Sequence, residues 1–285
     1  MTWIIGHIFA AAIGMSLGLL GGGGSVLAVP VLVYVMGIAP KQAIAMTLVI
    51  VGIVSLLGSI PHWRKGRIEL ATVGLFGSST MVGAFMGAKI AALPWMTGTV
   101  QMLLFAVMML IAAIATIAKS HPDRAATEDE ELDLYPRPVC KYCWLWLLTE
   151  GLGVGILTGL VGVGGGFAIV PALVLLGKIP MRNAIGTSLV IIALNSIAAV
   201  IGYVGQVNFD WQLITSFTLV AAFGTLIGSY LSEFIPARRL QQGFGYFLLV
   251  VATFVLFQNR HQFLPKPTSN LSEIQLETNR SIECS

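Results

Sequence analysis

The sequence has too few charged residues to cover the surface of a soluble protein. Only 10% of its 285 residues are charged and 56% are hydrophobic, whereas a soluble domain has about a quarter charged residues. The formal net charge of +3 is small, and the basic residues lie in short loops instead of forming a stripe, so nothing supports nucleic-acid binding. We therefore expect lipid to surround most of the chain.

Reactive side chains are scarce too, and their absence excludes further classes of function. The pair formed by Cys140 and Cys143 has only His121 near it, whereas a metal site needs a second pair or several histidines. We interpret the pair as ordinary thiols. The apolar segments hold no cluster of histidines, cysteines or carboxylates, and the chain has no GxxxxGKS or GxxxxGKT motif. We expect no enzymatic activity, no metal or other cofactor, and no direct use of ATP.

Long apolar runs make up most of the chain. They cover residues 3–37, 41–61, 70–93 and 98–118, and they recur between 144 and 257. Several reach the roughly 20 residues with which a helix crosses about 30 Å of hydrocarbon. Because backbone amides in lipid must be bonded within the segment, continuous apolar runs indicate helices and an all-α fold. No Lys or Arg precedes the first run, so we expect it to remain in the membrane instead of being cleaved as a signal peptide.

The chain is duplicated with a displacement of 141 residues. The sequence GLLGGGGSVLAVPVLV from Gly18 returns as GLVGVGGGFAIVPALV from Gly159, and QAIAMTLVI from Gln42 returns as NAIGTSLVI from Asn183. We predict two membrane repeats at 1–118 and 142–257. Between them, 119–141 is predicted to be an exposed, acidic cytoplasmic linker, and 258–285 a polar, mostly disordered tail.

Basic residues predict how the repeats are oriented. The loop after the third segment and the linker are two crossings apart, and their basic residues place both in the cytoplasm: Arg64, Lys65, Arg67, Lys119, Arg124, Arg137 and Lys141. In the second half the basic residues mark the opposite loops: Lys178, Arg182, Arg238 and Arg239. The two repeats are therefore predicted to be inverted, each with a glycine-broken helix pair followed by three spanning helices.

Two glycine runs are predicted to break their helices. The first apolar run is too long for one crossing, and its middle is Gly21 to Gly24, where each glycine costs up to about 1 kcal/mol in a helix. The equivalent run is Gly162 to Gly166. We expect the two breaks to face each other near the midplane, with helices restarting at Ser25 and Phe167. Their amide groups and positive dipole ends would form an anion site.

The other notable residues have two interpretations. Gly83 with Gly87, and Gly224 with Gly228, have the four-residue spacing of close helix packing, which could also explain the glycine runs. Serines and threonines after the breaks could bind an oxyanion or satisfy their own helix carbonyls. The predicted substrate-binding residues are Gly22, Gly23, Gly24, Ser25, Thr47, Gly164, Gly165, Gly166, Thr187, Ser188 and Asn195, of which Asn195 is the preferred one because a buried amide needs partners on both sides.

The paired glycine runs, the prolines that follow them, and AIAMT with AIGTS resemble the TauE/SafE family of sulfite exporter-like membrane permeases. The resemblance covers about residues 5–257, and GLVGVGGGFAIVPAL is similar to the family's pattern. The first half departs mildly, with Gly22 and Ser25 where the second half has Val163 and Gly166. The resemblance implies transport of small sulfur-containing anions, such as sulfite or organosulfonates, by a multi-pass bacterial plasma-membrane protein.

The preferred reading is a secondary transporter for a small anion, in the plasma membrane or, in a Gram-negative cell, the inner membrane. A channel, or a scaffold subunit that transports no sulfur anion, is the alternative. The expected partners are a small anionic solute and lipid, with a homo-oligomer left open. No carboxylate sits in the middle of an apolar run, so the sequence assigns no coupling ion.

Overall fold

The computed structural model describes residues 2–91, 93, 96–119, 143–161, 165–175, 177, 179–203, 205, 207 and 209–258. These residues form helices, turns and bends but no strand, which confirms the all-α prediction for this part of the chain. Seven of the helical segments in it are long and apolar enough to cross a membrane. The predicted linker beyond Lys119, the tail beyond Gln258, Cys140 and the candidate site residue Gly164 lie outside the described residues.

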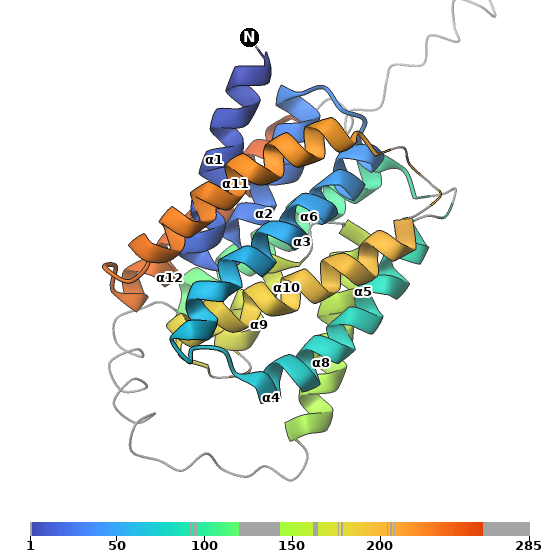
Figure 1. The fold of residues 1–285 in the computed structure, drawn as a ribbon. Coiled ribbons are helices and arrows are strands. Elements are labelled where there is room, and N and C mark those ends of the chain that lie inside the picture. The colour runs from blue at the N-terminus through green and yellow to red at the C-terminus, as the bar shows by residue number, and fades with distance from the viewer. Residues whose placement is uncertain are drawn as a thin grey trace, which may run out of the picture.

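The helices occur in the same order in both halves of the chain (Figure 1). The first half contains α1 (Thr2–Leu20), α2 (Gly23–Pro30) continued by the π-helix η1 (Val31–Val35), α3 (Pro40–Arg64), α4 (Leu70–Thr72) continued by the π-helix η2 (Val73–Gly77) and α5 (Ser78–Ala91), and α6 (Gly98–Lys119). The second half contains α8 (Cys143–Val161), α9 (Gly166–Leu175), α10 (Met181–Tyr203), α11 (Trp211–Leu231) and α12 (Ala237–Gln258). The predicted domain limits stay a prediction.

The first glycine run breaks the helix, as predicted. Gly21 has φ +71, a conformation that favours glycine, and α2 restarts at Gly23 and lies against α1. In the second run Gly165, the equivalent of Gly24, has φ +82, and α9 starts at Gly166. The predicted restart sites, Ser25 and Phe167, were therefore two and one residues too late. A glycine is tolerated at a helix N-terminus because the first amides have no intrahelical partner in any case.

Glycines spaced by four residues bring two helix pairs into close contact. The pairs are α1 with α11 and α5 with α8, and their contact glycines are Gly14, Gly18, Gly224, Gly228, Gly83, Gly87, Gly155 and Gly159. A Cβ added at Gly83 would lie 2.8 Å from the Ile156 nitrogen, and one at Gly14 would lie 2.7 Å from the Ala221 carbonyl carbon. The packing interpretation of Gly83, Gly87, Gly224 and Gly228 is thus confirmed.

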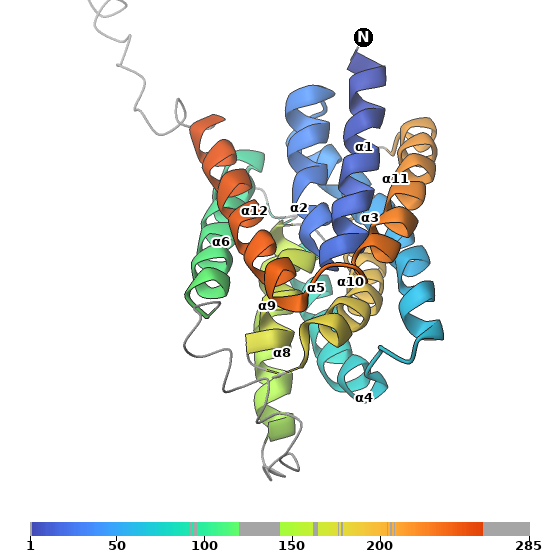
Figure 2. The ribbon, with the colours of Figure 1, turned by 90° about the vertical axis from the view of Figure 1, so that its left-hand side faces the viewer.

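The helix contacts are unchanged when the two halves are exchanged. Helix α1 packs on α11, and its equivalent α8 packs on α5; α3 also packs on α11, and its equivalent α10 packs on α5. Helices α3 and α10 contact each other, as do α6 and α12. Figure 2 shows α6 and α12 side by side at the left-hand side of the molecule. Nearly all strong helix contacts therefore join one half to the other.

The centre of the molecule is formed by α3 and α10. They are the most buried of the candidate spans, with 67% and 72% of their apolar windows buried, against 50% or less for the others. The outer helices instead expose large apolar side chains, such as Ile4, Phe223 and Val250, which are 67–70% exposed. Apolar residues on an outer surface are expected where the solvent is lipid.

Candidate functional site

The two glycine breaks touch at the centre of the molecule. A Cβ on Gly166 would lie 2.6 Å from the Cα of Gly22, and a Cβ on Gly22 would overlap the Gly166 carbonyl oxygen. Helix α2 begins one residue after Gly22, and α9 begins at Gly166, so two helix N-termini meet there. The candidate residues Gly23, Gly24 and Gly165 are buried beside this contact. Any side chain at Gly22 or Gly166 would force the two breaks apart.

Two serines hold the first break in its conformation. The Ser25 hydroxyl donates to the Gly22 carbonyl at 2.7 Å. The Ser188 hydroxyl, on α10, lies 3.2 Å from the Gly21 carbonyl and 2.8 Å from the Ile185 carbonyl. Both serines are fully buried. Their hydrogens are thus used on backbone carbonyls, so each can offer a solute only the lone pairs of its oxygen.

Polar side chains without a protein partner lie on α3 and α10. The Thr47 and Ser55 hydroxyls on α3 and the Ser196 hydroxyl on α10 are buried and form no hydrogen bond within the described residues. Asn195 is 1% exposed, and neither its amide nitrogen nor its oxygen has a partner there. Buried polar groups are nearly always satisfied, so such a set is the kind of lining that water or an anion completes. Thr47 is the repeat equivalent of Ser188, and Ser55 of Ser196.

Thr187 lies apart from these groups, near the end of α3. Its Oγ1 accepts a hydrogen bond from the Glu69 backbone amide at 3.1 Å. This bond fixes the loop between α3 and α4 to α10, next to Gly186. The sequence predicted Thr187 among the residues that bind the solute, whereas the structure places its oxygen against a loop.

Sequence reasoning missed two polar groups at the ends of the central helices. Tyr203 ends α10 and is 2% exposed; Gln101 Nε2 donates to its hydroxyl at 3.3 Å and to the Leu160 carbonyl at 3.0 Å. His62, near the end of α3, is 3% exposed, and neither ring nitrogen has a partner within the described residues. The repeat displacement of 141 residues relates His62 to Tyr203, and that comparison could have identified both.

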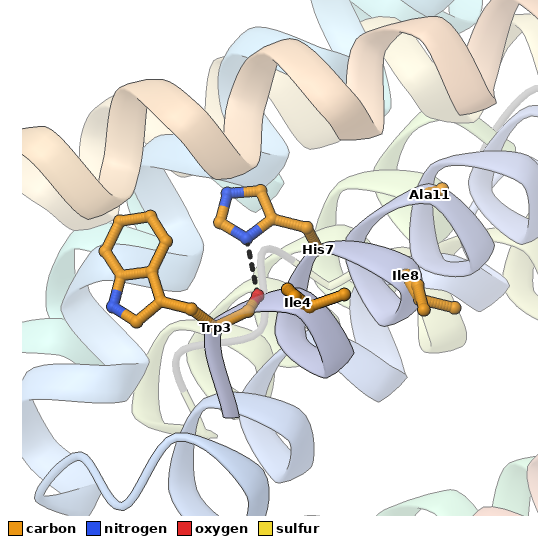
Figure 3. Close-up of a pocket in the computed structure, with 5 residues that line it drawn as sticks. All are labelled: Trp3, Ile4, His7, Ile8 and Ala11. Atoms are coloured by element: carbon orange, nitrogen blue, oxygen red, sulfur yellow. Dashed lines mark hydrogen bonds between the residues drawn. The ribbon is translucent and has the colours of Figure 1, made fainter. Parts of the chain in front are cut away.

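A surface hollow of about 430 Å³ lies on the outer side of α1. It is lined by Trp3, Ile4, His7, Ile8 and Ala11, and Figure 3 shows the Trp3 and His7 rings side by side. A ring nitrogen of His7 is bonded to the Trp3 carbonyl oxygen at 2.8 Å. Because the hollow is open and lined mainly by apolar groups on an exposed face, it suits lipid chains better than a small polar solute.

These features define a class of protein: a multi-pass helical membrane protein with two short helices that start at its centre. Residues 7–255 match the family described as sulfite exporter TauE/SafE, so the chain belongs to this family. The resemblance to this family that we identified from the sequence is therefore confirmed. It is a multi-pass membrane protein of a transporter family, and in a bacterium such a protein lies in the plasma membrane.

Several curated proteins are similar to the chain over most of its length. A "Probable membrane transporter protein" of Xylella fastidiosa (strain Temecula1) is 30% identical over 87% of this chain and 92% of its own. "Probable membrane transporter protein YdhB" of Bacillus subtilis is 24% identical over 79% of this chain and 88% of its own. A protein from Methanocaldococcus jannaschii, also named as a probable membrane transporter, is 24% identical over 86% and 93%. No solved structure matches the chain.

Proposed function

We propose that this protein is a secondary transporter that moves a small anion across the plasma membrane by alternating access around its paired helix breaks. The contact between Gly22 and Gly166 carries the proposal, because it brings two helix N-termini to one buried point. Amide groups and positive dipole ends at such a point favour a negative charge. The family suggests that the anion contains sulfur, as sulfite and organosulfonates do.

We further propose that the two repeats are inverted with respect to the membrane. The exchange symmetry of the helix contacts supports this arrangement. The direction of the helices supports it as well, because α1 begins at the top of Figure 2 and α8 begins near the bottom. The basic residues Arg64, Lys65 and Arg67 then place the loop between α3 and α4 in the cytoplasm.

The proposed solute site lies around the two breaks. Asn195 and Thr47 supply buried polar atoms that have no hydrogen-bond partner among the described residues. The full proposed set is Gly22, Gly23, Gly24, Ser25, Thr47, Gly164, Gly165, Gly166, Thr187, Ser188 and Asn195, with Thr187 at its cytoplasmic edge. In this set the glycines at the helix starts would supply backbone amides that have no intrahelical partner, and Ser25 and Ser188 keep the first break in place.

Flux into proteoliposomes tests the proposal. We expect the purified protein to carry radiolabelled sulfite or isethionate, with rates measured under proton and sodium gradients to identify the coupling ion. Gly22→Ala should reduce the rate at least about tenfold, because its Cβ overlaps the Gly166 carbonyl oxygen and a central overlap costs more than about 1.4 kcal/mol. Gly153→Ala is the matched control, since Gly153 is exposed on α8 and a Cβ there meets no atom within 4 Å.

Three results would contradict the proposal. If the folded wild-type protein carried no anion across a broad panel of sulfur oxyanions, the proposed substrate class would be wrong. If flux occurred but no ion gradient ever accumulated the anion, the protein would be a channel. Equal flux in Gly22→Ala and Gly153→Ala would remove the central break from the transport path.

A further inference from the structure

The end of α3 that we place in the cytoplasm carries a buried histidine, His62. His62 is only 3% exposed, and neither ring nitrogen is hydrogen-bonded within the described residues. The chain turns just after it, so that the backbone amides of Lys65 and Arg67 both donate to the His62 carbonyl, at 3.3 and 3.1 Å, and two cationic residues adjoin the histidine. A buried imidazole beside two cations is a set of groups that together favour an anion.

The two cations share one carboxylate from the other half of the molecule. Lys65 Nζ forms an ion pair with Glu233 Oε1, and Arg67 Nη1 lies 3.7 Å from the same oxygen. Glu233 follows α11, whereas both cations follow α3, so the pairs join the two repeats. One carboxylate leaves the pair of cations with an excess positive charge. Its oxygens occupy the place that the oxygens of a sulfonate or of sulfite could take.

The same loop is anchored to α10 just beside the first glycine break. A Cβ at Gly186 would lie 2.9 Å from His62 Cβ and 3.2 Å from the Arg67 carbonyl oxygen. The next residue, Thr187, accepts the Glu69 amide, and Ser188 after it contacts the Gly21 carbonyl. Consecutive residues of α10 therefore connect the loop to the break.

We propose that His62, Lys65 and Arg67 form a second anion-recognition site, at the cytoplasmic mouth of the transport path, and that Glu233 occupies it as an internal stand-in for the transported anion. The inference rests on the proposed function as an anion transporter. An arriving sulfonate or sulfite displaces the Glu233 carboxylate and so frees the loop between α3 and α4 from the corner after α11. The anion thereby releases one of the contacts between the two repeats at this mouth, while the bond from the Glu69 amide to Thr187 remains.

Equilibrium binding of radiolabelled isethionate and sulfite to the full chain in nanodiscs tests the inference. Glu233→Gln should tighten binding about two- to fivefold, because a competing carboxylate in a partly exposed ion pair is removed. Arg67→Gln should weaken binding about tenfold or more, because a charge-assisted contact is lost. Glu233→Asp, which keeps the charge on a shorter side chain, provides a second variant if Glu233→Gln does not fold.

Arg239→Gln is the control for general electrostatics. Arg239 is exposed near the start of α12, a few residues after Glu233, so its loss changes the charge of the same end without touching the cluster. Binding that is unchanged or weaker in Glu233→Gln, or an Arg239→Gln effect as large as that of Arg67→Gln, would overturn the inference. A wild-type protein that binds neither anion would instead overturn the proposed function, and the inference with it.

Discussion

The two ends of the central helix pair have the same packing but different chemistry. Tyr203 and His62 are equivalent residues, each in the last turn of its helix and each at most 3% exposed. At the Tyr203 end, Gln101 joins the phenol to the Leu160 carbonyl through neutral hydrogen bonds. At the His62 end, the ring has no partner within the described residues, and the adjoining loop is held by ion pairs with Glu233. Duplication thus preserved the helix contacts while the polar groups diverged.

The difference matters because the two kinds of contact respond to different conditions. Neutral hydrogen bonds between buried groups are little affected by salt or by dissolved anions. Ion pairs that are a quarter or more exposed, as those of Lys65, Arg67 and Glu233 are, weaken with ionic strength. Among the described residues, the printed contacts at the His62 end are therefore sensitive to charge, whereas the hydrogen bonds of Gln101 at the Tyr203 end are not.

The largest expected effect tests what the halves have in common. Gly14→Leu and Gly155→Leu are equivalent changes that force α1 from α11 and α8 from α5. Each should lower the free energy of unfolding by about 3 kcal/mol or more, because a side chain would meet backbone directly. Denaturation in mixed micelles would measure this loss, with Gly153→Leu as a control whose Cβ meets no atom. A large effect in only one half would break the equivalence of the halves.

The next largest effect on stability distinguishes the Tyr203 end of the central helix pair from the His62 end. Gln101→Leu leaves the Leu160 carbonyl and the Tyr203 hydroxyl without their shared donor, and it should reduce the unfolding free energy by about 1–3 kcal/mol. Its repeat equivalent, Gln242→Leu, should have a smaller effect because Gln242 is only half-buried. The same denaturation assay compares them, and equal losses would show that the network at the Tyr203 end has no special role.

Replacement by phenylalanine should lower the unfolding free energy at Tyr203 but not at His62. Tyr203→Phe removes a bonded hydroxyl and should cost about 0.5–1.5 kcal/mol of unfolding free energy. His62→Phe removes two buried nitrogens that have no partner in the described part of the chain, so stability should be unchanged or higher while isethionate binding weakens. Thermal unfolding and equilibrium binding measure the two properties separately. A destabilised His62→Phe protein would indicate that the imidazole has a structural role.

The smallest effect concerns the ion pairs themselves. Lys65→Gln should cost only about 0.2–1 kcal/mol, because both partners are partly exposed, and the cost should shrink as salt is raised from 50 to about 500 mM. Unfolding midpoints over that salt range measure the change. Tyr203→Phe provides the comparison, since its cost should not depend on salt.

Much of the fold could be predicted from the sequence because lipid imposes simple rules. The apolar runs predicted the membrane-spanning helices, and the four-residue spacing of Gly83 and Gly87 correctly identified a helix-packing face. The position of the first break followed from Gly21 to Gly24, but the restart at Gly23 did not. Glycine disfavours a helix interior, whereas at an N-terminus it meets no such penalty, and residue type alone does not distinguish the two.

The site was less predictable because its roles depend on neighbours distant in sequence. Ser188 and Thr187 are adjacent and chemically alike, yet one contacts the Gly21 carbonyl and the other accepts the Glu69 amide. Which glycines of the two runs meet across the centre also requires the packed structure. His62 was missed because its burial depends on Gly186 of α10, where any larger residue would press against the imidazole.

The packing between the two halves also limits which helices can move together as a rigid body during transport. The glycine-lined contacts tie α1 to α11 and α5 to α8, and each pair draws one helix from either half. A rigid-body rotation of one half against the other would have to separate both of these helix contacts at once. We therefore expect interleaved helix pairs, and not the duplicated halves, to be the units that move during transport.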